Sequence, residues 1–157
     1  MARMQYLVLH CTATPEGREV SSEEIRHWHT DPVSKGGRGW KQVGYTDLIH
    51  LDGKVERLVA NNEDAEVDPW EVTNGAKGYN CVSRHVVYVG GLAKDGKSAK
   101  DTRTPAQMKA MTDYVRNFHE RFPQIKIVGH CDLAGVKKSC PSFDVGKWLQ
   151  SIGVYQQ

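Results

Sequence analysis

Two short apolar runs, one near each end of the chain, lead into a histidine. Residues 5–9 are followed directly by His10, and residues 125–128 are followed, after a single glycine, by His130. Apolar runs of this length are typical of strands that are buried on both faces of a sheet. If the two strands finish side by side, the two imidazoles lie close together. The sequence therefore predicts a sheet whose strand ends form a polar cluster.

The loop that follows His130 adds a third candidate metal ligand. It contains Gly135 and carries Lys138 and Cys140 back toward the end of the strand. Zinc accepts imidazole and thiolate ligands together, and a catalytic zinc site has three protein ligands and one position open to water. His10, His130 and Cys140 are therefore candidate zinc ligands.

Two other interpretations stay open from the spacing alone. A histidine that ends a strand is commonly a hydrogen-bonded structural residue, and a lone cysteine is commonly a small buried hydrophobic group. Alternatively, a zinc ion could have a purely structural role, which would require a fourth protein ligand such as Cys11 or Cys131. The sequence has no short cysteine pair of the CxxC kind to support that alternative.

Local patterns predict the elements that follow the first strand. Ser21 and Glu24 have the spacing of a capping box, which predicts a helix over about residues 22–30. The Asp52-Gly53 pair predicts a tight turn between two antiparallel strands. We expect the acidic stretch that comes next to form a long loop, which either borders a functional cleft or has no role.

The second half of the chain predicts a further strand and two helices. Residues 84–91 are rich in valine and end on paired glycines, as expected of a central strand. Thr104 is a candidate cap for a helix with Pro105 at its first position, and residues 142–151 predict a last helix. The apolar stripe expected to pack the first of these helices on the sheet is Met108, Met111, Tyr114, Val115, Phe118 and Phe122.

This order of elements predicts an α/β fold with a mixed central β-sheet flanked by helices. The length of 157 residues suits a single domain that spans residues 1–157. A hydrophobic content of 39% and a charged content of 25% are ordinary for a globular protein. The sequence contains no internal repeat and no apolar run long enough to cross a bilayer.

Charge and cysteine content narrow the class of protein. The 21 basic and 19 acidic residues leave a net charge of +2, which is too balanced to indicate a nucleic-acid-binding protein. The first residues do not resemble a secretory signal, so we expect a cytoplasmic protein with four free or metal-bound cysteines rather than a disulfide framework. We also expect a monomer without stable membrane association.

Six segments form a pattern that extends over nearly the whole chain. They are VLHCTAT at residues 8–14, VGY at 43–45, AKGYN at 76–80, VGG at 89–91, TPAQM at 104–108 and KSCPSFD at 138–144. In composition and order they resemble the phage-lysozyme type of zinc N-acetylmuramoyl-L-alanine amidase, a family related to the peptidoglycan recognition proteins.

The resemblance implies an activity and a set of residues. It implies hydrolysis of the amide between N-acetylmuramic acid and L-alanine in peptidoglycan, by a phage or prophage endolysin that stays in the cytoplasm until it is released to the cell wall. The implied cofactor is Zn²⁺, held by two histidines and a cysteine at the positions of His10, His130 and Cys140. The implied non-ligand catalytic residues are Tyr45 and Lys138, although a strand-start aromatic and a solvated loop charge are the ordinary interpretations of these two side chains.

Other implied features concern the substrate. The resemblance suggests that Lys77, Tyr79 and Asn80 line the groove for the stem peptide. The family commonly has a histidine where this chain has Thr46, and another where it has Gly75. Members of the wider family that lack the cysteine ligand bind wall fragments without cleaving them, and some phage amidases inhibit their phage's RNA polymerase. A non-catalytic peptidoglycan-binding module and a polymerase regulator are therefore the alternative functions.

Overall fold

A five-stranded mixed sheet forms the centre of the protein in the computed structural model, which describes residues 2–156. Its strand order is β5-β4-β7-β2-β9, in which β5 runs antiparallel to β4 and the other four strands are mutually parallel. The bounds are β2 (Tyr6–Cys11), β4 (Asp47–Ile49), β5 (Val55–Arg57), β7 (Ser83–Tyr88) and β9 (Lys126–Gly129). The α/β class with a mixed sheet flanked by helices, predicted from the sequence, is confirmed.

Two short strand pairs lie outside the main sheet. β1 (Ala2–Arg3) pairs with β6 (Glu66–Val67), and β3 (Thr14–Pro15) pairs with β8 (Gly91–Leu92). The acidic stretch predicted as a loop therefore contains β6, together with the short 3₁₀ turn η2 (Pro69–Glu71).

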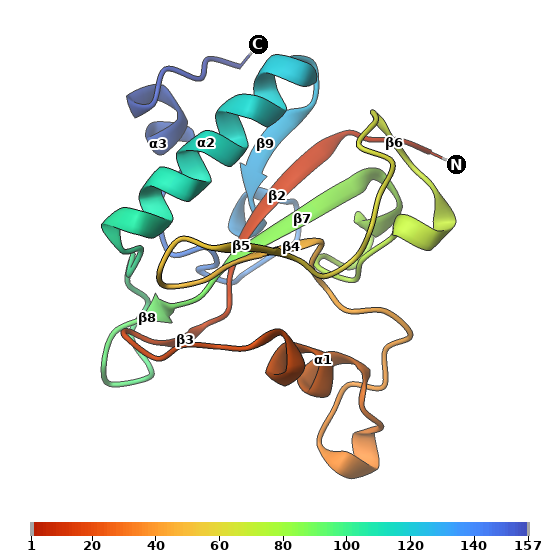
Figure 1. Cartoon of the computed structure of the whole chain (residues 1–157), viewed down its shortest axis with the longest axis vertical. Helices are drawn as coiled ribbons and strands as arrows, with labels where there is room; N and C mark the ends of the chain where they lie inside the picture. The colour runs from red at the N-terminus through yellow and green to blue at the C-terminus, as the bar shows by residue number, and fades with distance from the viewer. Residues whose placement is uncertain (1, 157) are drawn as a thin grey trace.

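Three α-helices complete the fold (Figure 1). They are α1 (Ser22–Thr30), α2 (Pro105–Arg121) and α3 (Val145–Ser151), and the remaining 3₁₀ turns are η1 (Val33–Lys35), η3 (Asn80–Val82) and η4 (His130–Asp132). Ser21 and Thr104 cap α1 and α2 as predicted, because their side chains accept hydrogen bonds from backbone N–H groups in the first turn of each helix.

The structure corrects two details of the predicted helices. Met108 was expected on the buried stripe of α2, but its side chain is 41% exposed and Gln107 is buried in its place. The buried Gln107 amide donates to the carbonyl oxygens of Ile49 and Val89, which is why a polar residue is tolerated there. The last helix begins at Val145 rather than at residue 142, because the Asp144 side chain caps it.

The helices cover the two faces of the sheet unequally. Figure 1 shows α2 and α3 side by side, with α1 apart from them and next to the loop that follows β2. One apolar cluster joins α2 and α3 to one face of the sheet and includes Leu7, Val86, Met111, Val115 and Leu149. A smaller cluster joins α1 to the opposite face through Ile25, Leu48 and Val87.

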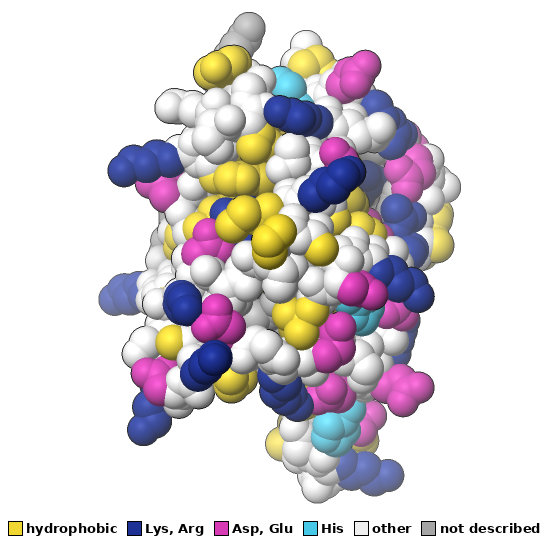
Figure 2. Space-filling model, turned by 60° about the vertical axis from the view of Figure 1, so that its left-hand side comes forward, with side chains coloured by type: hydrophobic (Ala, Val, Ile, Leu, Met, Phe, Trp, Pro, Cys, Tyr) yellow, Lys and Arg dark blue, Asp and Glu magenta, His cyan; other side chains and the backbone are white. Residues whose placement is uncertain are grey.

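Basic and acidic side chains are interspersed over the face of the molecule shown in Figure 2, in keeping with the nearly balanced net charge. Among residues 2–156, no helix combines the length and the hydropathy that crossing a bilayer requires.

Candidate metal centre and its cleft

The three predicted ligands come from three separate segments and meet at one end of the sheet. His10 lies near the end of β2, His130 begins the turn η4 directly after β9, and Cys140 lies in the loop before α3. Their ligand atoms all lie within 4.8 Å of one another. The Nδ1 atom of His10 lies 3.7 Å from the Sγ atom of Cys140, and the rings of His10 and His130 have centroids 4.7 Å apart.

Local contacts explain why the Cys140 loop returns to the strand ends. The Cys131 N–H donates to the Cys140 carbonyl oxygen at 2.8 Å, and the buried Tyr88 hydroxyl donates to the Pro141 carbonyl oxygen at 2.7 Å. Gly129 permits this approach, because a Cβ atom there would lie 2.9 Å from Cδ of Pro141. The turn η4 and the strand β7 thus hold the loop at Cys140 and at the residue that follows it.

The chemistry of this donor set fits a zinc ion. Burial lowers the pKa of His10 and of His130, and nearby positive charge, including that of Lys138, lowers both further, so both imidazoles stay neutral and keep a lone pair. The Cys11 N–H donates to the Cys140 sulfur at 3.2 Å, which would stabilise a thiolate.

The side chains of Cys140 and Cys11 also influence each other's protonation. Within the protein alone, this interaction and burial raise the pKa of Cys140, while the interaction lowers the pKa of Cys11 to about 7. A divalent cation among the three ligand atoms would reverse that preference, because a cysteine binds metal as the thiolate. Within residues 2–156 the ligand group includes neither Cys11 nor Cys131, so the arrangement has three protein donors, as in a catalytic rather than a structural site.

A cleft of about 310 Å³ opens over the three ligands, and Tyr45 and Lys138 both line it. The Tyr45 ring is held between His10 and His29, at centroid distances of 5.1 Å and 5.3 Å. Burial and the nearby Cys140 and Cys11 sulfurs raise the pKa of Tyr45, so its hydroxyl keeps its proton and acts as a donor. Lys138 is exposed at the rim, on the same loop as Cys140.

Several cleft residues were not predicted from the sequence as site residues. The wall formed by α1 and the following loop includes Trp28, His29, Arg38 and Trp40. The Arg38 guanidinium lies over the Trp40 ring at 5.1 Å, and His29 packs against the other aromatic rings. Burial, with a further contribution from Arg38, lowers the pKa of His29 to about 4, and its neutral Nδ1 accepts the Gly44 N–H at 2.9 Å. This bond fixes the backbone next to Tyr45.

The predicted substrate-binding residues lie beside the cleft rather than in its lining. Lys77 is exposed, and the Tyr79 ring packs edge-on against Tyr6 at a centroid distance of 5.9 Å. The side chain of Asn80 turns inward, where its Oδ1 accepts the Ala76 N–H at 2.8 Å. Roles for Lys77, Tyr79 and Asn80 in binding the stem peptide remain predictions.

Comparison with known proteins shows the family of this chain. Residues 1–143 match the family described as N-acetylmuramoyl-L-alanine amidase. The chain belongs to this amidase family. The endolysin of Enterobacteria phage K11 is 35% identical over 143 residues, which cover 91% of this chain and 83% of that protein.

Solved structures extend the family likeness to the fold. The Ph2119 endolysin from Thermus scotoductus MAT2119 bacteriophage Ph2119 matches with a TM-score of 0.70 at 26% identity, over 99% of this chain and 88% of that one. Drosophila PGRP-LB matches with a TM-score of 0.69 at 16% identity, over 99% of this chain and 85% of that one, and at this identity the likeness shows the fold alone. The fold of this chain is therefore similar to that of both endolysins and peptidoglycan recognition proteins.

His85 is a further polar residue of this amidase-family chain that the sequence analysis did not assign to the site. It lies on β7 with no exposed surface, and its Nδ1 is 2.8 Å from Nε2 of His10. Burial, with a contribution from His130, lowers its pKa to about 3. The available signal was a histidine in an otherwise valine-rich buried strand, since an unpaired buried polar group is costly and calls for a specific partner.

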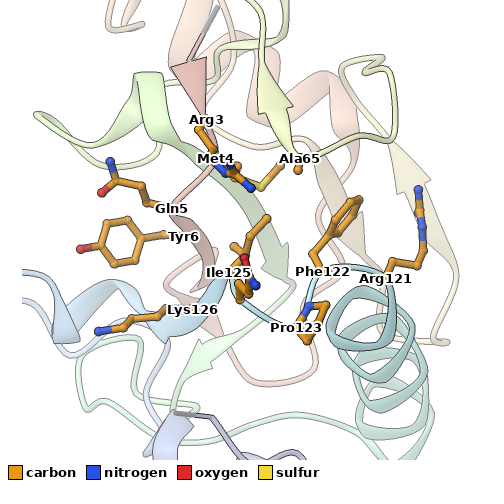
Figure 3. Close-up of a pocket in the computed structure, with 11 residues that line it drawn as sticks. Arg3, Met4, Gln5, Tyr6, Ala65, Arg121, Phe122, Pro123, Ile125 and Lys126 are labelled. Atoms are coloured by element: carbon orange, nitrogen blue, oxygen red, sulfur yellow. The ribbon is translucent and has the colours of Figure 1, made fainter.

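A second groove, of about 550 Å³, lies at the opposite end of the strands (Figure 3). Arg3, Met4 and Ile125 line it where β2 and β9 begin, and Phe122 and Arg121 border it from the end of α2. Its lining residues, as far as the structure describes them, include neither a histidine nor a cysteine. In open α/β sheets, ligands bind outside the carboxyl ends of the strands, which is where His10 and His130 lie.

Proposed function

We propose that this protein is a zinc-dependent N-acetylmuramoyl-L-alanine amidase that acts on peptidoglycan as a phage endolysin. The observation that carries the proposal is the convergence of His10, His130 and Cys140 within 4.8 Å at the floor of a cleft that also contains Tyr45 and Lys138. Family membership and the endolysin relatives support the same activity. As an endolysin, the protein would reach the wall once the membrane is opened.

His10, His130 and Cys140 would hold the zinc ion. When bound, zinc polarises the scissile carbonyl and lowers the pKa of water toward neutrality, which addresses both the poor electrophile and the weak nucleophile of amide hydrolysis. The protein itself holds two of these donors in place, because His10 is part of the central strand β2 and the Cys140 loop is hydrogen-bonded to the turn η4 and to β7.

Tyr45 and Lys138 would stabilise the negative charge that develops on the carbonyl oxygen. Tyr45 is a neutral hydroxyl donor at the cleft, and the Lys138 ammonium group supplies a positive charge on the same loop as Cys140. Donors that are already in position stabilise a transition state more than mobile water does, because they need no reorganisation.

The cleft also suits a glycopeptide substrate. Trp28 and Trp40 offer apolar ring surface, while Arg38 and Lys138 offer two positive charges from two different loops. Among the described residues that line the cleft, none is an aspartate or glutamate. Such a surface favours a substrate that combines an apolar sugar ring or side chain with carboxylates.

The test is a metal analysis coupled to digestion of purified cell-wall sacculi. Wild-type protein should contain about one zinc ion per chain and release stem peptides, and it should lose this activity with a chelator and regain it with zinc. His130→Ala should lose both the zinc and the activity. His27→Ala is the matched control, because His27 is an exposed histidine on α1 that pairs with Asp31 away from the cleft.

Two outcomes would contradict the proposal. Activity that survives complete removal of zinc would exclude a metal-dependent mechanism. Binding of muropeptides by the zinc-loaded wild type without any release of peptide would instead indicate the non-catalytic binding module.

A further inference from the structure

A continuous chain of hydrogen bonds leads from the backbone to the candidate ligand His10. The Ala76 N–H is 2.8 Å from Oδ1 of Asn80, which is 3.1 Å from Nε2 of His85. Nδ1 of His85 is in turn 2.8 Å from Nε2 of His10. The two rings are almost fully buried, at 0% and 1% exposure. This series of hydrogen bonds begins at a backbone amide and ends at the imidazole of His10, which faces Cys140.

Each bond in this chain fixes the direction of the next. A backbone N–H can only donate, so the atom of Asn80 that receives it must be the amide oxygen. That oxygen can only accept, so His85 carries its proton on Nε2. An imidazole that carries its single proton on Nε2 has a lone pair on Nδ1, so the 2.8 Å contact between the two rings is made by the proton on His10 Nε2. His10 is therefore left with a bare Nδ1, the atom that lies 3.7 Å from the Cys140 sulfur.

We propose that His85 and Asn80 are positioning residues that hold His10 in the one tautomer able to bind a metal ion through Nδ1. Metal-bound histidines commonly donate their other ring N–H to a protein acceptor, and such acceptors orient the ligand. Here the acceptor is a second histidine on the neighbouring strand, itself fixed by an amide side chain. The inference rests on the proposed metal centre, since it assigns a role relative to that ion.

The absence of a side chain at Gly75 leaves the space that the His85 ring occupies. A Cβ atom at Gly75 would lie 2.5 Å from Cγ and 2.6 Å from Nδ1 of His85, closer than packed atoms approach. The family resemblance places a histidine at the position of Gly75. In this chain the ring of His85, contributed by β7, occupies the space that a side chain from the loop would need.

The first measurement uses wild-type protein and long-range ¹H–¹⁵N correlation of the histidine rings, with and without zinc. We expect His10 to carry its proton on Nε2 and His85 to carry its proton on Nε2 in both states. A proton on Nδ1 of His10 in the zinc-free protein would overturn the proposal, whatever the metal affinity is. This readout needs no substitution and no enzyme activity.

The second measurement is zinc affinity by competition with a chelator. His85→Phe keeps a ring of similar size but removes the acceptor, and we expect zinc to bind about 10–100-fold more weakly. His85→Asn restores an acceptor near the position of Nδ1 and should recover most of the affinity. Ser83→Ala is the matched control, because Ser83 is buried on the same strand and its Oγ has no hydrogen-bond partner among the described residues.

The outcomes separate this inference from the proposed function. If His85→Phe binds zinc as tightly as Ser83→Ala does, His85 is only a packing residue and the inference fails while the metal centre stands. If wild-type protein binds no zinc, the metal centre fails, and the ring-nitrogen measurement still reports which tautomer His10 adopts. If His85→Phe does not fold, the wild-type spectra and His85→Asn decide the question.

Discussion

The two faces of the central sheet are built from the same strands but differ in chemistry. On β2, Leu7 and Leu9 point to the face covered by α2 and α3, while His10 points to the opposite face. On β7, Val86 and Tyr88 join the apolar cluster under α2, whereas His85 lies next to His10. Because side chains alternate along a strand, each strand contributes to both faces. Neighbouring residues of one strand therefore serve different purposes: one packs in the apolar cluster, and the next faces the candidate metal centre.

This comparison predicts that substitutions on the two faces have different consequences. On the α2 face they should lower the stability of the fold, and on the other face they should alter metal binding or turnover in a protein that remains folded. Leu7→Ala and Tyr45→Phe test this separation, and substitutions at Gly75 and His50 probe further polar contacts; the four are given in order of decreasing effect.

Leu7→Ala should have the largest effect on stability. Leu7 has no exposed surface and packs in the apolar cluster under α2 and α3. Loss of its side chain leaves a cavity, and we expect the free energy of unfolding to fall by about 2–5 kcal/mol. Denaturant titration measures this, and zinc affinity at low denaturant should stay unchanged. A folded Leu7→Ala protein with greatly weakened zinc binding would show that the two faces are not independent.

Tyr45→Phe should produce the opposite pattern. It removes only the hydroxyl proposed to stabilise the developing charge, and loss of one such donor lowers turnover by about 100–1,000-fold. The ring contacts with His10 and His29 remain, so the unfolding midpoint should shift little. Release of peptide from sacculi and the unfolding midpoint are measured on the same preparation. Turnover within a factor of two of wild type would remove Tyr45 from the reaction.

Gly75→Ala tests a contact between a loop and the chemical face of the sheet. The added Cβ would press on the His85 ring and on the Gly44 carbonyl oxygen, so we expect a loss of about 1–3 kcal/mol in unfolding free energy. In a His85→Gly background the clash with the ring disappears and that with Gly44 persists, so the loss should be smaller. Denaturant titration of the four proteins gives the coupling, and strictly additive effects would contradict the contact.

Substitution of His50 should have the smallest effect on the free energy of unfolding, and the size of this effect should depend on pH. Its partial burial acts to lower its pKa, but hydrogen bonds with Glu56 and Glu19 outweigh this, and the pKa is raised above 6.5. A raised pKa means that the pairs stabilise the fold below the unfolded value and stop doing so as pH rises through the folded value. His50→Gln should therefore destabilise by under about 1 kcal/mol at about pH 5.5 and less at about pH 8.5. Equal losses at both pH values would contradict this.

Much of the fold could be predicted from local sequence because local chemistry determines it. Ser21 and Glu24 close the capping box of α1, and the Asp52-Gly53 turn joins β4 to β5 as predicted. The prediction that Met108 is buried was wrong, because the helical period alone cannot tell which edge of the apolar stripe of α2 is buried. The neighbouring Gln107 is buried instead, because its amide donates to two backbone carbonyl oxygens, one in β4 and one directly after β7.

The candidate site was predictable where its residues mark strand ends or belong to a quoted motif. His10, His130 and Cys140 fall in this class, and the structure brings them together, although their binding of zinc remains a prediction. His85 and Arg38 could not be assigned, because their roles depend on contacts with distant segments. The hydrogen bond of His85 to His10 joins residues 75 positions apart, and no periodicity in the sequence reports it.

The position of β2 in the strand order has a consequence for how the protein is made. This strand is the first of the main sheet to leave the ribosome, yet both of its neighbours, β7 and β9, are synthesised much later. Until then its apolar residues have no sheet partner, and pairings between distant segments form slowly. Because His130 and Cys140 also lie far along the chain from His10, the three candidate ligands can meet only after the long intervening segment has been synthesised.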